Sequence, residues 1–155
     1  MRRTKPEPRV VSTDVRYNSV PVTFFINRMM ERGKKSVATT IVYDALDIVK
    51  EKSGKDPIEV METALKNVGP MMEVRPRRVG GATYQVPMEV ASGRKMTLAM
   101  RWIIDAATGR TGNSYAEKLS AELLDAANNQ GAAVRKREET HKMAEANRAF
   151  SHFRV

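Results

Sequence analysis

Three arginines followed by a pair of glycines are the residues of this sequence best suited to bind a ligand. Arg75, Arg77 and Arg78 precede Gly80-Gly81, and Tyr84 follows. Guanidinium groups bind phosphates through two parallel hydrogen bonds and stack on bases, while glycines let a backbone approach a ligand closely. Most runs of charge only solvate a surface, but this clustering favours contact with folded RNA.

The distribution of charge over the whole chain also indicates a polyanionic partner. Lys and Arg number 27 against 18 Asp and Glu, which gives a formal net charge of +9. Between residues 44 and 66 acids outnumber bases six to four, whereas residues 75–101 hold six bases and one acid. The positive charge is therefore segregated. It concentrates in the N-terminal segment, a loop with Arg32, Lys34 and Lys35, the segment of Arg75 to Arg78, and a turn with Arg94 and Lys95.

Carboxylates at helical spacing leave an enzyme as an alternative. Asp44, Asp47 and Glu51 would share one helical face and could hold a divalent metal or do acid-base work. Neighbouring lysines would neutralise them, and His141 and His152 lack the spacing of a zinc site. With no cysteine in the chain, thiolate chemistry is excluded. We therefore expect no catalytic residue, no metal and no cofactor.

The spacing of apolar residues predicts a mainly α fold with six helices. Two helix starts are marked by capping boxes, Asp56 with Glu59 and Ser114 with Glu117, and Ser36 is a plausible cap for the second helix. The last helix has few apolar residues, so little of it should be buried. The six helices are expected near residues 21–33, 36–54, 57–69, 96–109, 114–127 and 132–150.

Two segments depart from the helical pattern. Residues 72–90 alternate apolar and polar side chains around Gly80-Gly81, which predicts a β-hairpin. Since an isolated hairpin is only marginally stable, we expect it to protrude between the third and fourth helices. Residues 1–19 are basic and lack apolar periodicity, so an extended arm is expected. At this length residues 1–155 should form one domain, and no apolar run approaches the roughly 20 residues that span a bilayer.

The hairpin string VRPRRVGGATYQVPMEV, from Val74 to Val90, resembles the signature of the bacterial-type small-subunit ribosomal protein S-seven family. The strings GKKS (33–36), LAMRWI (98–103) and KREETHKMAEANRAFSHFR (136–154) resemble other family segments in the same order. The resemblance covers nearly the whole chain. Departures are Arg32, where an acidic residue is expected, and a less basic turn at residues 91–93.

The resemblance implies a structural protein of the ribosome rather than an enzyme. It would bind the head domain of small-subunit ribosomal RNA, help nucleate assembly of the head, and lie near the exit-site transfer RNA and messenger RNA. Neighbours would include the ribosomal proteins S-nine and S-eleven. The protein would not bind a membrane. The location would be the cytoplasm, with a bacterial-type organelle ribosome as the alternative.

The predicted RNA-binding residues come from the charge clusters and from positions that match the family. A DNA-binding regulator remains a competing reading, but it would need a basic recognition helix, and the clearest helices here are acidic or neutral. The predicted residues are Arg2, Arg3, Arg32, Lys34, Lys35, Arg75, Arg77, Arg78, Tyr84, Arg94, Lys95, Arg101, Arg110 and Lys142.

Overall fold

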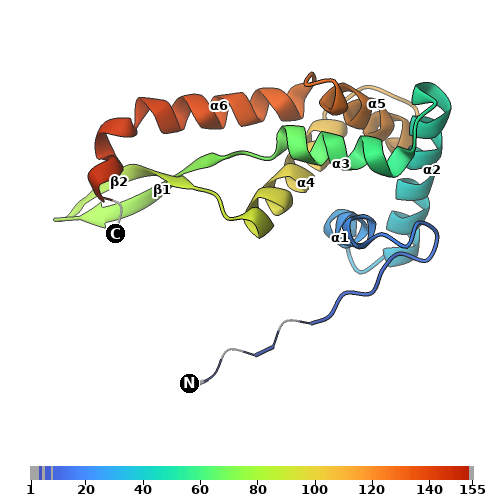
Figure 1. The fold of residues 1–155 in the computed structure, drawn as a ribbon, viewed down its shortest axis with the longest axis horizontal. Helices are drawn as coiled ribbons and strands as arrows, with labels where there is room; N and C mark the ends of the chain where they lie inside the picture. The colour runs from blue at the N-terminus through green and yellow to red at the C-terminus, as the bar shows by residue number, and fades with distance from the viewer. Residues whose placement is uncertain (1–3, 5, 8, 154–155) are drawn as a thin grey trace.

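The fold, taken from a computed structural model, consists of six α-helices, a short 3-10 helix and a two-stranded hairpin (Figure 1). The structure describes residues 4, 6–7 and 9–153. The predicted mainly α fold, with the hairpin between the third and fourth helices, is confirmed. The elements are α1 (Val20–Met29), α2 (Lys35–Ser53), α3 (Pro57–Val68), β1 (Met72–Val79), β2 (Ala82–Glu89), α4 (Ser92–Thr108), α5 (Tyr115–Ala127), α6 (Ala132–Ala146) and η1 (Arg148–Phe153).

Local capping signals start two of the helices as the sequence predicts. The Asp56 carboxylate accepts a hydrogen bond from the Ile58 amide, and the Ser114 hydroxyl accepts one from the Glu117 amide. The Glu117 carboxylate in turn accepts from the backbone N–H of Asn113 at 3.2 Å. These bonds satisfy amides that a helix N-terminus leaves without a partner, which is why both boundaries were predictable.

Four predicted boundaries differ from the structure. Helix α1 ends at Met29 and not at Gly33. Helix α2 begins at Lys35, so Ser36 lies inside the helix and is not its cap. Helix α4 begins at Ser92, four residues before the apolar spacing starts, which places Arg94 and Lys95 in its first turn rather than in a preceding loop. The last helix ends at Ala146, and the chain continues as the 3-10 helix η1. Exposed first turns carry little apolar signal, so the pattern missed the start of α4.

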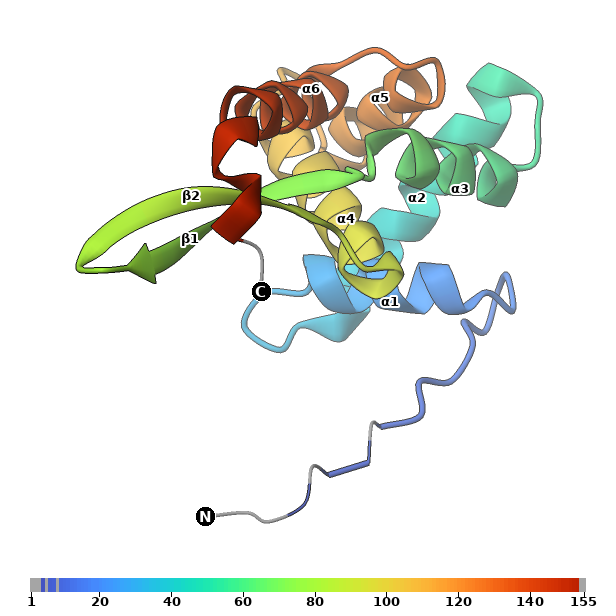
Figure 2. The same cartoon turned by 60° about the vertical axis from the view of Figure 1, so that its left-hand side comes forward.

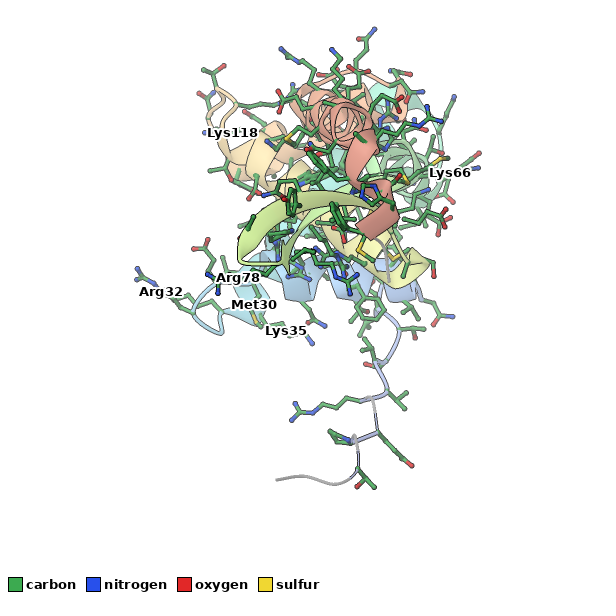
Figure 3. The ribbon with its side chains drawn as sticks, turned by 90° about the vertical axis from the view of Figure 1, so that its left-hand side faces the viewer. Met30, Arg32, Lys35, Lys66, Arg78 and Lys118 are labelled. Carbon is green, nitrogen blue, oxygen red and sulfur yellow. The ribbon has the colours of Figure 1, made fainter. Side chains whose placement is uncertain are left out.

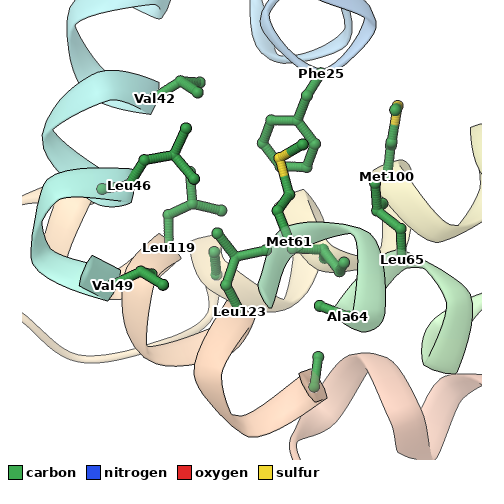
Figure 4. Close-up of a cluster of buried hydrophobic side chains, with 14 of the residues drawn as sticks. Phe25, Val42, Leu46, Val49, Met61, Ala64, Leu65, Met100, Leu119 and Leu123 are labelled. Atoms are coloured by element: carbon green, nitrogen blue, oxygen red, sulfur yellow. The ribbon is translucent and has the colours of Figure 1, made fainter. Parts of the chain in front are cut away.

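The hydrophobic core lies around α5, which packs against α2, α3 and α4. Leu119 and Leu123 of α5 are fully buried against Leu46 of α2 and Met61 of α3, as the close-up in Figure 4 shows. Phe25 of α1 closes the same cluster. Each such side chain contributes about 1.5–3 kcal/mol when it leaves water. This core is the rigid base from which the loops and the hairpin extend.

The hairpin turns at two glycines in the left-handed region. Gly80 and Gly81 have φ values of +58° and +89°, and Val79 pairs with Ala82 across the turn. Positive φ at both central residues matches the twist of antiparallel strands. The strands reach away from the helical body, as Figures 1 and 2 show. Helix α6 packs on β1 and η1 on β2, so the base and middle of the hairpin are covered and its turn projects.

The predicted arm of residues 1–19 is held to the fold from Asp14 onward. The buried Asp14 carboxylate accepts hydrogen bonds from the Tyr43 hydroxyl at 2.6 Å and from the Arg16 and Tyr17 amides at 3.0 and 2.9 Å. Arg16 donates two hydrogen bonds to Asp47 of α2, at 2.8 and 3.0 Å. The extended part of the arm therefore ends before Asp14. None of the helices in the described part of the chain is both long and apolar enough to cross a membrane.

Candidate nucleic-acid interface

The loop between α1 and α2 is a tight turn that exposes three cations. Its central residues, Arg32 and Gly33, have φ values of +51° and +73°, and the Lys34 amide bonds to the Glu31 carbonyl at 3.0 Å. This is the pattern of a mirror-image β-turn, and it directs Arg32 and the two lysines that follow into solvent. Within the described residues, Arg32, Lys34 and Lys35 form no ion pair, so their charge is available to a phosphate.

The outer end of the hairpin brings another cation to the same side of the molecule. Arg78 is exposed, pairs with Thr83 across the strands and directly precedes the turn. In the view along the hairpin, Arg78, Arg32 and Lys35 lie on the same side (Figure 3). Two clusters that are more than 40 residues apart in the sequence therefore lie toward one side of the molecule, although the hairpin turn and the α1–α2 loop are well separated along its long axis (Figure 1). We call this side the loop-hairpin face and define it by Arg32, Lys34, Lys35 and Arg78.

Arg75 and Arg94 have a structural partner as well as exposed surface. Both donate through Nε to the carboxylate of Glu73, Arg75 at 2.6 Å and Arg94 at 2.8 Å. The Glu73 side chain is 9% exposed, whereas the two arginines are 49% and 48% exposed. The two arginines neutralise the buried carboxylate of Glu73, and these bonds join the base of the hairpin to the start of α4. About half of each arginine side chain remains open to a ligand.

Arg77 and Tyr84 contact the C-terminal segment. Arg77 Nη1 donates to the Phe153 carbonyl at 3.0 Å. The Tyr84 ring stacks on Phe153 with centroids 5.0 Å apart and contacts Phe150 at 5.3 Å. These contacts fix η1 on the middle of the hairpin. The sequence offered no sign of them, and the predicted contact of Arg77 and Tyr84 with RNA stays a prediction.

The remaining predicted residues fall in different places. Arg101 is exposed on α4, while Lys95 and Lys142 lie away from the loop-hairpin face, in a groove between α3, α4 and α6. Arg2 and Arg3 lie outside the described residues. The structure therefore joins some predicted residues into one face and separates others from it.

Arg110 lies in a network of ions that holds the start of α6. Its Nε donates to Glu122 at 2.6 Å, and its Nη2 donates to Asp125. Glu122 is fully buried and also accepts the Ala133 amide at 2.9 Å. Burial lowers the pKa of the Arg110 guanidinium, but the two carboxylates outweigh this and raise the pKa above its ordinary value. Arg110 is thus a structural clamp, and the extent of its contact with RNA stays a prediction.

The carboxylate face proposed for an enzyme is partly occupied by the chain itself. Asp47 holds Arg16, whose guanidinium lies over the rings of Tyr17 and Tyr43 at 5.2 and 5.3 Å. No three His, Asp or Glu side chains in the described part of the chain are grouped to hold a metal ion. The bonds from Arg16 to Asp47 and from Tyr43 to Asp14 were missed in the sequence because they join residues 31 and 29 positions apart. What the geometry offers is exposed cations for binding anions.

Comparisons with known proteins agree with this chemistry. The sequence profile of the family described as "Ribosomal protein S7p/S5e" matches residues 1–148. A protein of Fervidobacterium nodosum is 60% identical over 154 residues, with 99% of each chain covered. Proteins of Thermomicrobium roseum and Xanthobacter autotrophicus are 54% and 60% identical over 153 residues, covering 99% of this chain and 98% of theirs. All three relatives carry the name "Small ribosomal subunit protein uS7".

Proposed function

Because the chain belongs to the S7p/S5e family of ribosomal proteins, we propose that it is a structural component of the small ribosomal subunit that binds the head domain of small-subunit ribosomal RNA. Proteins of this family are structural parts of ribosomes and are not enzymes in general. The loop-hairpin face carries the proposal. It presents four exposed cations, drawn from two separate turns, on one side of a rigid helical core.

The physical basis of binding is electrostatic. Lysines and arginines that neutralise phosphates release counterions, so affinity falls steeply as salt rises. Seven of the predicted cations form no ion pair within the described residues: Arg32, Lys34, Lys35, Arg78, Lys95, Arg101 and Lys142. With about 6 to 10 phosphate contacts, a logarithmic salt slope of about −5 to −8 is expected.

The finer assignments follow the family resemblance. We propose that the chain helps nucleate assembly of the head and lies near the exit-site transfer RNA and the messenger RNA. Its neighbours in the subunit would include the ribosomal proteins S-nine and S-eleven. The ribosome would be that of a bacterial cytoplasm, with a bacterial-type organelle as the alternative.

The first test compares two polyanions. Purified protein is titrated with the head domain of small-subunit ribosomal RNA and with duplex DNA of equal length, at several salt concentrations. Strong preference for the folded RNA at physiological salt supports the proposal. Equal binding to both would reduce the chain to a general polycation and revive the DNA-binding alternative.

The second test removes three of the four cations of the loop-hairpin face. Lys34→Ala, Lys35→Ala and Arg78→Ala together should weaken RNA binding and reduce the salt slope by about 3, since each lost phosphate contact removes about one unit. Helical content should not change, because all three side chains are exposed. A matched control, Lys50→Gln with Lys52→Gln and Lys55→Gln, removes the same charge from an exposed surface near the α2–α3 turn. Equal loss in both variants would mean that net charge, not this face, determines binding.

A further inference from the structure

A groove of about 480 Å³ between α3, α4 and α6 gathers basic side chains from three elements. Its charged walls are Lys66 of α3, Lys95 of α4, and Arg137, Glu138 and Lys142 of α6. Lys66 lies on the opposite side of the molecule from Arg32, Lys35 and Arg78 in Figure 3. We call this hollow the α3–α6 groove, and it is separate from the loop-hairpin face.

The α3–α6 groove has an excess of positive charge. Within the described part of the chain, Lys66, Lys95 and Lys142 form no ion pair, and Arg137 pairs only with Glu138, at 3.6 Å. Four cations therefore surround one carboxylate. Like charges in one hollow repel each other, and an anion bound between them relieves that repulsion.

The walls of the groove are fixed by hydrogen bonds between elements. Arg137 donates to the carbonyl of Asn67, and the Asn67 amide donates to the carbonyls of Ala126 and Ala127 at 3.0 and 2.9 Å. His141 accepts the Met71 amide through Nε2 at 3.0 Å. Because these bonds hold α3, α5, α6 and the start of β1 together, the basic side chains rise from backbones that are already positioned.

Two further observations locate the cations over the groove. A Cβ atom at Gly69 would lie 2.7 Å from Cγ of Lys95, so the glycine leaves room for the lysine to cross the end of α3. Burial lowers the pKa of His141, and the charges of Arg137 and Lys95 lower it further. The imidazole thus lies in the positive field of the groove and stays neutral as an acceptor.

We propose that the α3–α6 groove binds a phosphate group of the RNA backbone, as a second contact on the face opposite the loop-hairpin face. This proposal rests on the proposed RNA-binding function and extends it. Lysine ammonium groups suit this role because they are compact point charges that bind phosphate oxygens without a fixed geometry. A chain that holds phosphates on two opposite faces would join two RNA segments, and not merely coat one.

The test uses the full chain and the same ribosomal RNA fragment. Lys66→Gln with Lys142→Gln removes two exposed cations of the groove and leaves the hydrogen bonds of its walls intact. Lys52→Gln with Lys55→Gln is the matched control. We expect the groove variant to bind about tenfold more weakly at moderate salt, with a salt slope reduced by about 1 to 2, and the control to bind as the wild type does.

A second readout locates the contact. Lysine acetylation followed by mass spectrometry should show that RNA protects Lys66 and Lys142 but not Lys52 and Lys55. Wild-type affinity and slope in the groove variant, together with unprotected groove lysines, would overturn the proposal. If the wild-type chain itself fails to prefer the ribosomal RNA, the proposed function fails first. Protection by an acidic peptide but not by RNA would identify the groove as a protein contact, which also overturns the proposal.

Discussion

Removal of the Arg110 side chain should destabilise the fold strongly, although the residue was predicted from its charge to bind RNA. In the variant Arg110→Ala, the fully buried Glu122 carboxylate keeps only the Ala133 amide as a donor. Loss of one partner of a buried ion pair costs about 3–5 kcal/mol. Since the Arg110 side chain is 27% exposed and water screens part of the interaction, the lower end, about 3 kcal/mol, is expected.

Urea denaturation followed by circular dichroism measures this loss. The free energy of unfolding is extrapolated to water. In a separate thermal melt, the melting temperature should fall by about 6–12 °C for a chain of this size. The assay also tests the prediction that residues 1–155 form one domain, because one domain should unfold in a single transition. Two separate transitions would contradict it.

Two controls isolate the buried charge. Adding Glu122→Gln to Arg110→Ala should recover much of the stability, because the amide oxygen still accepts the Ala133 N–H and no buried charge is left. Arg101→Ala removes an exposed arginine and should cost less than about 0.5 kcal/mol. A cost of Arg110→Ala no larger than that of Arg101→Ala would refute this structural role. Arg110 would then be free to act at the RNA surface.

Three further changes test other contacts. The pKa of His141 is lowered in the folded state, and the protonated ring cannot accept the Met71 amide. Its contribution to stability is therefore full above about pH 6.5 and is lost as pH falls toward the folded pKa. His141→Gln should make the free energy of unfolding less dependent on pH between pH 7 and pH 5, and an unchanged dependence would contradict this role. Gly131→Ala should lower the free energy of unfolding, measured by urea denaturation, by about 2–4 kcal/mol, because φ is +95° and the new Cβ would lie 2.8 Å from Glu122 Oε1. An unchanged free energy of unfolding would show that the backbone relaxes there. Tyr84→Ala should release η1 from the hairpin at a cost of about 1–3 kcal/mol, seen as faster amide exchange confined to η1 and β2; unchanged exchange would show that the ring contacts contribute nothing.

The sequence was sufficient where structure depends on neighbours along the chain. Asp56 and Ser114 start helices through bonds to amides two or three residues away, and Gly80-Gly81 makes a turn that only positive φ allows. The basic loop and hairpin were found for the same reason, because the cations are adjacent in the chain. The helix starts, the hairpin turn and the two basic segments were therefore predictable from local rules, whereas the position of those segments on one side of the molecule was not.

Contacts between distant residues were beyond those rules. The charge of Arg110 was visible, but its partners lie 12 and 15 residues away, across a loop whose path the spacing does not determine. Likewise the hairpin was expected to stand alone, and nothing in its alternation indicates that Tyr84 meets the C-terminal aromatics. The α3–α6 groove needs Lys66 and Lys142 together, and only the packing of α3 on α6 brings them near each other.

The ion pairs divide the basic residues by role rather than by position. Arg16, Arg75, Arg94 and Arg110 each bond to a carboxylate of the chain, as planar guanidinium groups do well. The lysines of the loop and the groove have no such partner in the described part of the chain. Part of the positive charge thus stabilises the fold. The net charge of +9 therefore does not tell how many cations are available to bind RNA. A cation that already holds a carboxylate of the chain is less available to a phosphate, so we expect its contribution to RNA binding to be smaller. Charge counts along the sequence cannot separate a clamp such as Arg110 from a cation such as Lys34, which forms no ion pair within the described residues.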